Sequence, residues 1–161
     1  ILILILSVPI SEYSKKIILD NNQFVKNQIV INPETKSSKV IDRVMTIRFN
    51  IEIDKALKWD FKPLVDIKEI KVGENNIIKY EGINLSTKTI TATADFIMDP
   101  IKITPYLIKT ECFCFTKQTL APGESQIFVM VFFLDPSLDL DKDLDKTNDL
   151  VFTYQLSEYK S

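Results

Sequence analysis

The chain of 161 residues has a formal net charge of −2, from 20 lysines and arginines against 22 aspartates and glutamates, and it contains no histidine. Its length fits one domain with its own core, and 45% hydrophobic with 26% charged residues is typical of a globular protein. The balanced charge predicts no nucleic-acid partner. The absence of histidine excludes nucleophiles activated by imidazole and zinc sites built on imidazole.

The N-terminal segment, residues 1–10, consists of bulky aliphatic residues with one serine and one proline and no charge. A helix that crosses a bilayer needs about 20 apolar residues, so this segment is too short to span alone. Two interpretations stay open: a buried strand, favoured by the β-branched isoleucines, and the end of a transmembrane anchor, favoured by a start without Met. We expect residues 1–10 to be the end of a membrane anchor, residues 11–40 a polar linker, and residues 41–158 the folded domain.

Short segments of strand pattern follow one another from residue 45 onward, and no segment of convincing length has helical periodicity. Met45 to Asp54 alternates strictly between apolar and polar residues, which predicts a half-buried strand. Further strands are expected at 67–72, 77–85, 90–98, 106–115, 127–134 and 150–156, with residues 55–63 as a loop or edge strand. Turn residues separate these segments at short intervals. The pattern predicts an all-β fold, an immunoglobulin-like antiparallel β-sandwich.

The acidic connection, residues 135–149, begins like a calcium loop, with aspartate at alternate positions from Asp139 to Asp145. An EF-hand needs glycine at its sixth position and glutamate at its twelfth. Leu144 and Leu150 stand there instead. The sequence therefore favours a solvated loop without a metal.

Cys112 and Cys114 are the only cysteines, and one residue separates them. On a regular strand both thiols share a face, with Phe113 and Phe115 toward the core and the two α-carbons about 6.6 Å apart, so we expect free thiols rather than a disulfide. Soft thiolates select copper(I), whereas zinc and iron-sulfur sites require about four ligands. Nearby Lys109 and Lys117 favour thiolate character. Burial as small hydrophobic side chains is the alternative role for these cysteines.

Several motifs together resemble the CtaG-type copper-chaperone family, which assembles the copper B centre of cytochrome c oxidase in mitochondria and related bacteria. Thr46 to Asn50 and Leu57-x-Trp59-x-Phe61-x-Pro63 are similar to its first strand and the segment after it. The most specific match is the stretch from Cys112 to Glu124, CFCFTKQTLAPGE, which Val131 to Pro136 continues. The resemblance runs from about Met45 to the C-terminus.

The resemblance implies a copper(I) chaperone rather than an enzyme, with Cys112 and Cys114 as metal ligands at a homodimer interface. It also implies delivery of copper(I) to the copper B site of cytochrome c oxidase subunit one, and loading by a copper donor protein. A single-pass anchor in the inner membrane is expected, with the domain in the bacterial periplasm or the mitochondrial intermembrane space.

The chain departs from the family pattern near its N-terminus. After Val8-Pro9-Ile10 the family usually has a cysteine, and this chain has Ser11 to Lys15 instead. Phe128 stands where the family commonly has methionine. Two other functions stay open: a β-sandwich that binds a protein partner without metal, and a thiol oxidoreductase that uses the cysteine pair.

Overall fold

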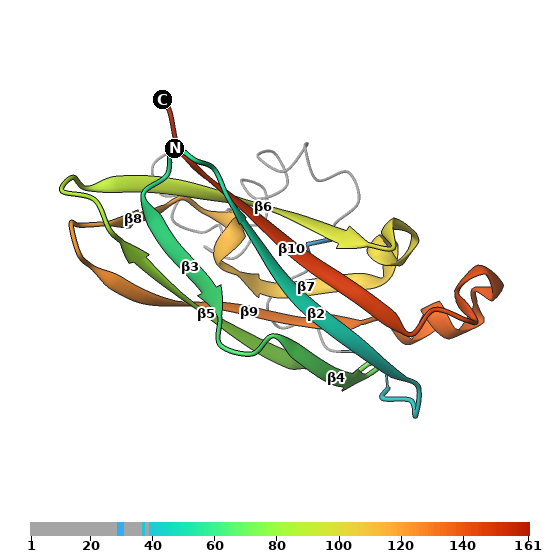
Figure 1. Cartoon of the computed structure of the whole chain (residues 1–161). Helices are drawn as coiled ribbons and strands as arrows, with labels where there is room; N and C mark the ends of the chain where they lie inside the picture. Colours follow the sequence, from blue (N-terminus) through green and yellow to red (C-terminus); the bar gives the residue numbers. More distant parts are fainter. Residues whose placement is uncertain (1–28, 31–36, 38) are drawn as a thin grey trace, which may run out of the picture.

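The computed structural model describes residues 29–30, 37 and 39–161, and shows two five-stranded sheets packed face to face (Figure 1). One sheet has the strand order β1-β7-β9-β5-β3, and the other has the order β4-β2-β10-β6-β8. The strands are β1 (Ile29–Val30), β2 (Val44–Ile53), β3 (Trp59–Pro63), β4 (Ile67–Lys71), β5 (Asn76–Asn84), β6 (Ile90–Asp99), β7 (Leu107–Cys112), β8 (Gln118–Leu120), β9 (Ser125–Leu134) and β10 (Asp149–Glu158). The predicted all-β sandwich is confirmed.

Among the strands that the structure describes, pairing is antiparallel except in two places. β1 runs parallel to β7, and β10 runs parallel to β2 with Phe152 opposite Phe49. Almost the whole domain separates β2 from β10 in the chain, so no tight hairpin imposes an antiparallel direction on them. The expectation of a purely antiparallel sandwich is corrected in these two pairs.

The alternating segments form strands because one face of each is buried against the opposite sheet. In β2, Met45, Ile47 and Phe49 are buried, whereas Arg48 and Asn50 are exposed. β3 lies at the edge of its sheet, which confirms one of the two interpretations of residues 55–63. β9 is central, as its apolar run suggested, although its first three residues are exposed.

The interior between the sheets contains a cluster of aromatic rings centred on Phe113. Its ring centroid lies 4.7 Å from that of Tyr154 and 5.4 Å from those of Phe61, Tyr80 and Phe128. Ring pairs at such distances stabilise a fold by about 0.5–1.5 kcal/mol each beyond the apolar area they bury. The cluster therefore ties residues after β7 to strands of both sheets.

The acidic connection extends from one end of the sandwich as two short 3-10 helices, η3 (Pro136–Leu140) and η4 (Lys142–Leu144), drawn in orange-red (Figure 1). Arg43 attaches it to the domain by donating hydrogen bonds to the carbonyl oxygens of Leu144 and Thr147 and by an ion pair with Asp139. A third 3-10 helix, η1 (Ile101–Tyr106), precedes β7. Among the described residues, no group of three or more acidic, cysteine or histidine side chains could hold a metal.

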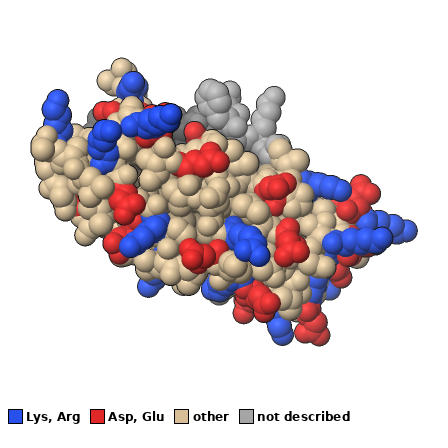
Figure 2. All heavy atoms as spheres, in the orientation of Figure 1, with Lys and Arg blue, Asp and Glu red and all other residues tan. Residues whose placement is uncertain are grey.

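The expected anchor, residues 1–10, and most of the expected linker lie outside the described residues. Within the described part, none of the helices has the length and apolar character needed to cross a bilayer. On the face of the molecule that Figure 2 shows, acidic and basic side chains are interspersed over the described surface.

Candidate functional site

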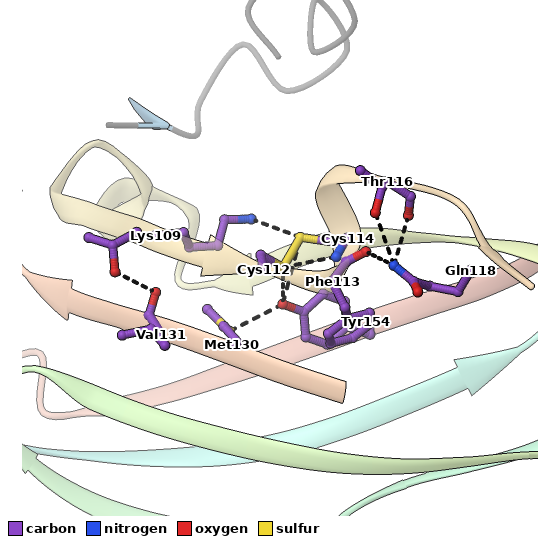
Figure 3. Close-up of a disulfide and its surroundings, with 10 residues drawn as sticks. Lys109, Cys112, Phe113, Cys114, Thr116, Gln118, Met130, Val131 and Tyr154 are labelled. Atoms are coloured by element: carbon purple, nitrogen blue, oxygen red, sulfur yellow. Dashed lines mark hydrogen bonds between the residues drawn. A yellow bond between two sulfur atoms is a disulfide. The ribbon is translucent and has the colours of Figure 1, made fainter. Parts of the chain in front are cut away.

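Strand β7 ends at Cys112, and the chain then turns through the 3-10 helix η2 (Phe113–Phe115). The cysteine turn, residues 112–118, is held by Gln118, whose Nε2 donates hydrogen bonds to the Phe113 carbonyl oxygen and to Thr116 Oγ1, both at 3.0 Å (Figure 3). The strand expected over 106–115 is therefore too long. Side chains after Cys112 do not alternate between two faces of a sheet.

A β-bulge at Thr110 determines which way Cys112 faces. Lys109 pairs with Phe132 and Glu111 with Val131, so β7 has one residue more than β9 at this point. The extra residue shifts the alternation of side chains along the strand. As a result Cys112 and Phe113 are both buried in the core, Phe115 is only partly buried, and the expected division into cysteine and phenylalanine faces is wrong.

Cys112 and Cys114 form a disulfide, with their α-carbons 5.1 Å apart. The expectation of two free thiols is wrong for this form of the protein. That expectation rested on the 6.6 Å spacing of a regular strand, and the 3-10 turn brings the α-carbons well inside the range that a disulfide bridges. The expected pair of sulfurs is nevertheless side by side at the end of β7.

Tyr154 of β10 reaches across from the opposite sheet to the sulfur atoms (Figure 3). Its hydroxyl oxygen lies 2.9 Å from Cys112 Sγ, 3.8 Å from Cys114 Sγ and 3.1 Å from Met130 Sδ. Complete burial raises the pKa of the Tyr154 hydroxyl well above its usual value, with a smaller contribution from Tyr80. The hydroxyl therefore keeps its proton at neutral pH and acts as a hydrogen-bond donor to sulfur.

Lys109 places a second polar group beside the sulfurs. The residue is completely buried, and its Nζ lies 3.7 Å from Cys114 Sγ and 4.3 Å from the centroid of the Phe96 ring. Burial lowers the pKa of the Lys109 amine to about 7. The expectation that Lys109 lies near the cysteines is confirmed, whereas the Lys117 Nζ instead lies over the Tyr159 ring, 3.6 Å from its centroid.

Each sulfur of the pair thus has a donor beside it, Tyr154 at Cys112 and Lys109 at Cys114. When the disulfide is reduced, these groups favour the thiolate form because a donor or cation close to sulfur stabilises negative charge. A reduced pair of this kind can bind a soft metal ion or exchange with another disulfide.

Two contributors to the site were not identified from the sequence, Tyr154 and Gln118. Tyr154 occupies an inward position of its strand together with Leu150, Phe152 and Leu156. A buried tyrosine usually has a hydrogen-bond partner for its hydroxyl, and this was the signal in the sequence that could have pointed to Tyr154. Nothing in the sequence by itself indicates that Gln118 would fasten the turn.

The fold and the site define a class: an all-β sandwich with a Cys-x-Cys pair held between its sheets. The model of the family described as "Cytochrome c oxidase assembly protein CtaG/Cox11" matches residues 15–158, and the chain belongs to this family.

Curated relatives named cytochrome c oxidase assembly protein CtaG agree with this assignment. The protein of Paracoccus denitrificans is 38% identical over 121 residues, which are 75% of this chain and 62% of the relative. That of Brucella ovis is 37% identical over 121 residues, or 75% of this chain and 60% of the relative. That of Ehrlichia ruminantium is 35% identical over 123 residues, which are 76% of this chain and 70% of the relative. The match therefore spans less than two thirds of the first two relatives.

Proposed function

We propose that this protein takes part in cytochrome c oxidase assembly, the role that the names of its family and relatives give, and that it does so as a copper(I) chaperone. In this proposal Cys112 and Cys114, once reduced, carry copper(I) as cargo to the copper B site of oxidase subunit one. The observation that carries the proposal is the placement of two sulfurs between Tyr154 and Lys109 in a chain of this family.

The chemistry of the ligands supports copper(I) as the cargo. Thiolates are soft ligands, and copper(I) prefers them. Copper(I) is satisfied by two or three sulfur ligands, so the cysteine pair of a single copy can already hold it. Among the described residues, no third cysteine, histidine or acidic side chain is grouped with the pair to begin a four-ligand zinc site. Two copies of the chain would together supply four thiolates, so we include a homodimer with copper at its interface.

The exchange of copper between proteins follows from the same ligands. A copper donor protein loads the pair, and thiolate exchange passes the ion to the oxidase. In this proposal the N-terminal segment anchors the domain in the inner membrane, with the domain in the periplasm or the intermembrane space. The protein acts as a carrier and not as an enzyme.

An anaerobic copper(I) titration of the reduced chain tests the proposal. We expect uptake of about one copper per chain, together with dimer formation in size-exclusion chromatography. The variant with Cys112→Ser and Cys114→Ser should lose this uptake. The oxidised wild-type chain is a matched control, because it has the same composition but its sulfurs are joined in the disulfide. Equal uptake by the double variant, or none by the reduced chain, would contradict the proposal.

A thiol oxidoreductase is the second candidate, and the disulfide is the observation that favours it. Such an enzyme would turn over many equivalents of a disulfide substrate. The carrier is preferred because the chain has no histidine to serve as a base. An assay with a disulfide peptide and an excess of dithiol distinguishes the two candidates: an oxidoreductase accelerates reduction of the peptide well above the rate with dithiol alone, whereas the carrier does not.

A further inference from the structure

The two sulfurs of the disulfide have different access to solvent. Cys112 is 6% exposed and belongs to the buried core, whereas Cys114 lies on the 3-10 helix η2 and is only partly buried. Thiol–disulfide exchange begins when a thiolate attacks one sulfur, and access to that sulfur is one determinant of the rate. An external thiol therefore reaches Cys114 more readily than Cys112.

The hydrogen bonds at Cys112 favour its departure. Its Sγ accepts a hydrogen bond from the backbone N–H of Cys114 at 3.2 Å and lies 2.9 Å from the Tyr154 hydroxyl (Figure 3). A sulfur that leaves a disulfide takes the bonding electron pair and becomes a thiolate, and it leaves faster when its negative charge is stabilised. Both donors are already in place in the oxidised protein.

We infer that an external dithiol opens this disulfide in one direction: it attacks Cys114, Cys112 leaves, and Tyr154 is the positioning residue that stabilises the leaving thiolate. The use of this step, to prepare the pair for copper(I), rests on the proposed function. The direction of attack does not depend on it, because the reaction takes place before any metal binds.

The electrons and bonds balance with a dithiol as the reductant. Its thiolate bonds to Cys114 Sγ while the bond between the two cysteine sulfurs breaks and its electron pair stays on Cys112. The second thiol of the reductant then attacks the mixed disulfide and releases Cys114. The reductant becomes a disulfide, and the cysteine pair has gained two electrons and the corresponding protons.

The opposite direction would make Cys114 the leaving group, with Lys109 beside it. That contact is longer, at 3.7 Å, and the attacker would have to reach a sulfur enclosed by the core. Both features favour attack at Cys114.

Trapping the mixed disulfide tests the direction directly. The oxidised, copper-free full chain is mixed with glutathione for a short time, quenched in acid, and treated with N-ethylmaleimide to block the released thiol. Peptide fragmentation on either side of Phe113 then locates the two labels. We expect glutathione on Cys114 at least about ten times as often as on Cys112. Equal labelling, or a preference for Cys112, would overturn the inference.

A pair of tyrosine variants tests the role of the hydroxyl. In Tyr154→Phe we expect reduction by dithiothreitol to slow about tenfold and the equilibrium constant for reduction to fall by a similar factor. Tyr80→Phe is the matched control. The ring centroid of Tyr80 lies 5.3 Å from that of Tyr154, and its buried hydroxyl bonds to no described group.

Tyr80→Phe should change neither quantity more than about twofold, since it removes a hydroxyl that does not touch the sulfurs. Equal behaviour of the two variants, both folded by circular dichroism, would contradict the role of Tyr154. The outcome of the copper titration is independent of these two tests. A chain that takes up no copper but forms the Cys114 adduct would refute the carrier function and leave this inference standing.

Discussion

The cysteine turn and the acidic connection are both short segments built on 3-10 helices, yet they differ in how their polar groups are used. In the acidic connection, Asp135 and Asp141 accept hydrogen bonds from backbone N–H groups two residues further on, and Asp141 also accepts one from Tyr106. In the cysteine turn, the sulfurs instead face a buried tyrosine and a buried lysine. Orientation toward buried donors, and not the number of potential ligands, distinguishes a site from a solvated loop.

The largest expected difference between the two segments concerns stability. Phe113→Ala removes the centre of the aromatic cluster and should lower the free energy of unfolding by about 3–5 kcal/mol. Leu140→Ala, in the acidic connection, changes a side chain that is 84% exposed and should stay within about 0.5 kcal/mol. Urea denaturation of both variants measures the contrast. Similar losses would mean that the cysteine turn is not part of the core.

Lys109 gives the cysteine turn a pH dependence. Its native pKa of about 7 lies below its usual 10.5, so between these values the unfolded chain binds more protons and stability rises with pH, by at most about 1.4 kcal/mol per pH unit. The chain has no histidine to obscure this window. Above this pH range, the raised pKa values of Tyr80 and Tyr154 make the native state bind more protons than the unfolded chain, so stability falls with pH.

Urea denaturation of the oxidised protein between pH 7 and pH 10 measures this slope. Lys109→Met should remove most of it. Lys142→Met, in the acidic connection, replaces an exposed lysine and should preserve it. A slope that survives in Lys109→Met would show that another group titrates in this range.

Arg43→Ala should affect the acidic connection and leave the cysteine turn unchanged. It removes the hydrogen bonds from Arg43 to the acidic connection and should cost about 2 kcal/mol, with faster amide exchange over residues 142–147. Copper uptake should not change, because none of these contacts reaches the sulfurs. Arg48→Ala, an exposed arginine on β2, is the control. A loss of copper in Arg43→Ala would show that the segments are coupled.

The smallest expected effect comes from Gln118→Ala. Loss of the hydrogen bonds from Gln118 to Phe113 and Thr116 should cost about 1 kcal/mol and weaken copper binding several-fold by loosening the turn. Gln126→Ala, at an exposed position of β9, provides the comparison. Competition with a copper(I) chelator, followed by isothermal titration calorimetry, measures the affinity of the chain for copper(I). Unchanged affinity would show that the turn keeps its shape without Gln118.

Most of the sandwich could be predicted because its strands depend on a local pattern, the alternation of buried and exposed side chains along β2, β5 and β10. β8 was missed because three residues are too few to show alternation. The disulfide was missed for a different reason. The bulge at Thr110 and the turn after Cys112 depend on contacts with β9 and Gln118. Such contacts produce no periodic pattern of apolar and polar residues in the sequence.

The position of β10 in the middle of its sheet has a consequence for biosynthesis. It is the last strand in chain order, yet it lies between β2 and β6 and supplies the tyrosine beside the sulfurs. While a ribosome still holds this strand, the sheet has a gap between β2 and β6, and Cys112 lacks its cover from Tyr154. The central pairing of this sheet and the cover of Cys112 by Tyr154 are therefore completed in the same step, when β10 enters between β2 and β6.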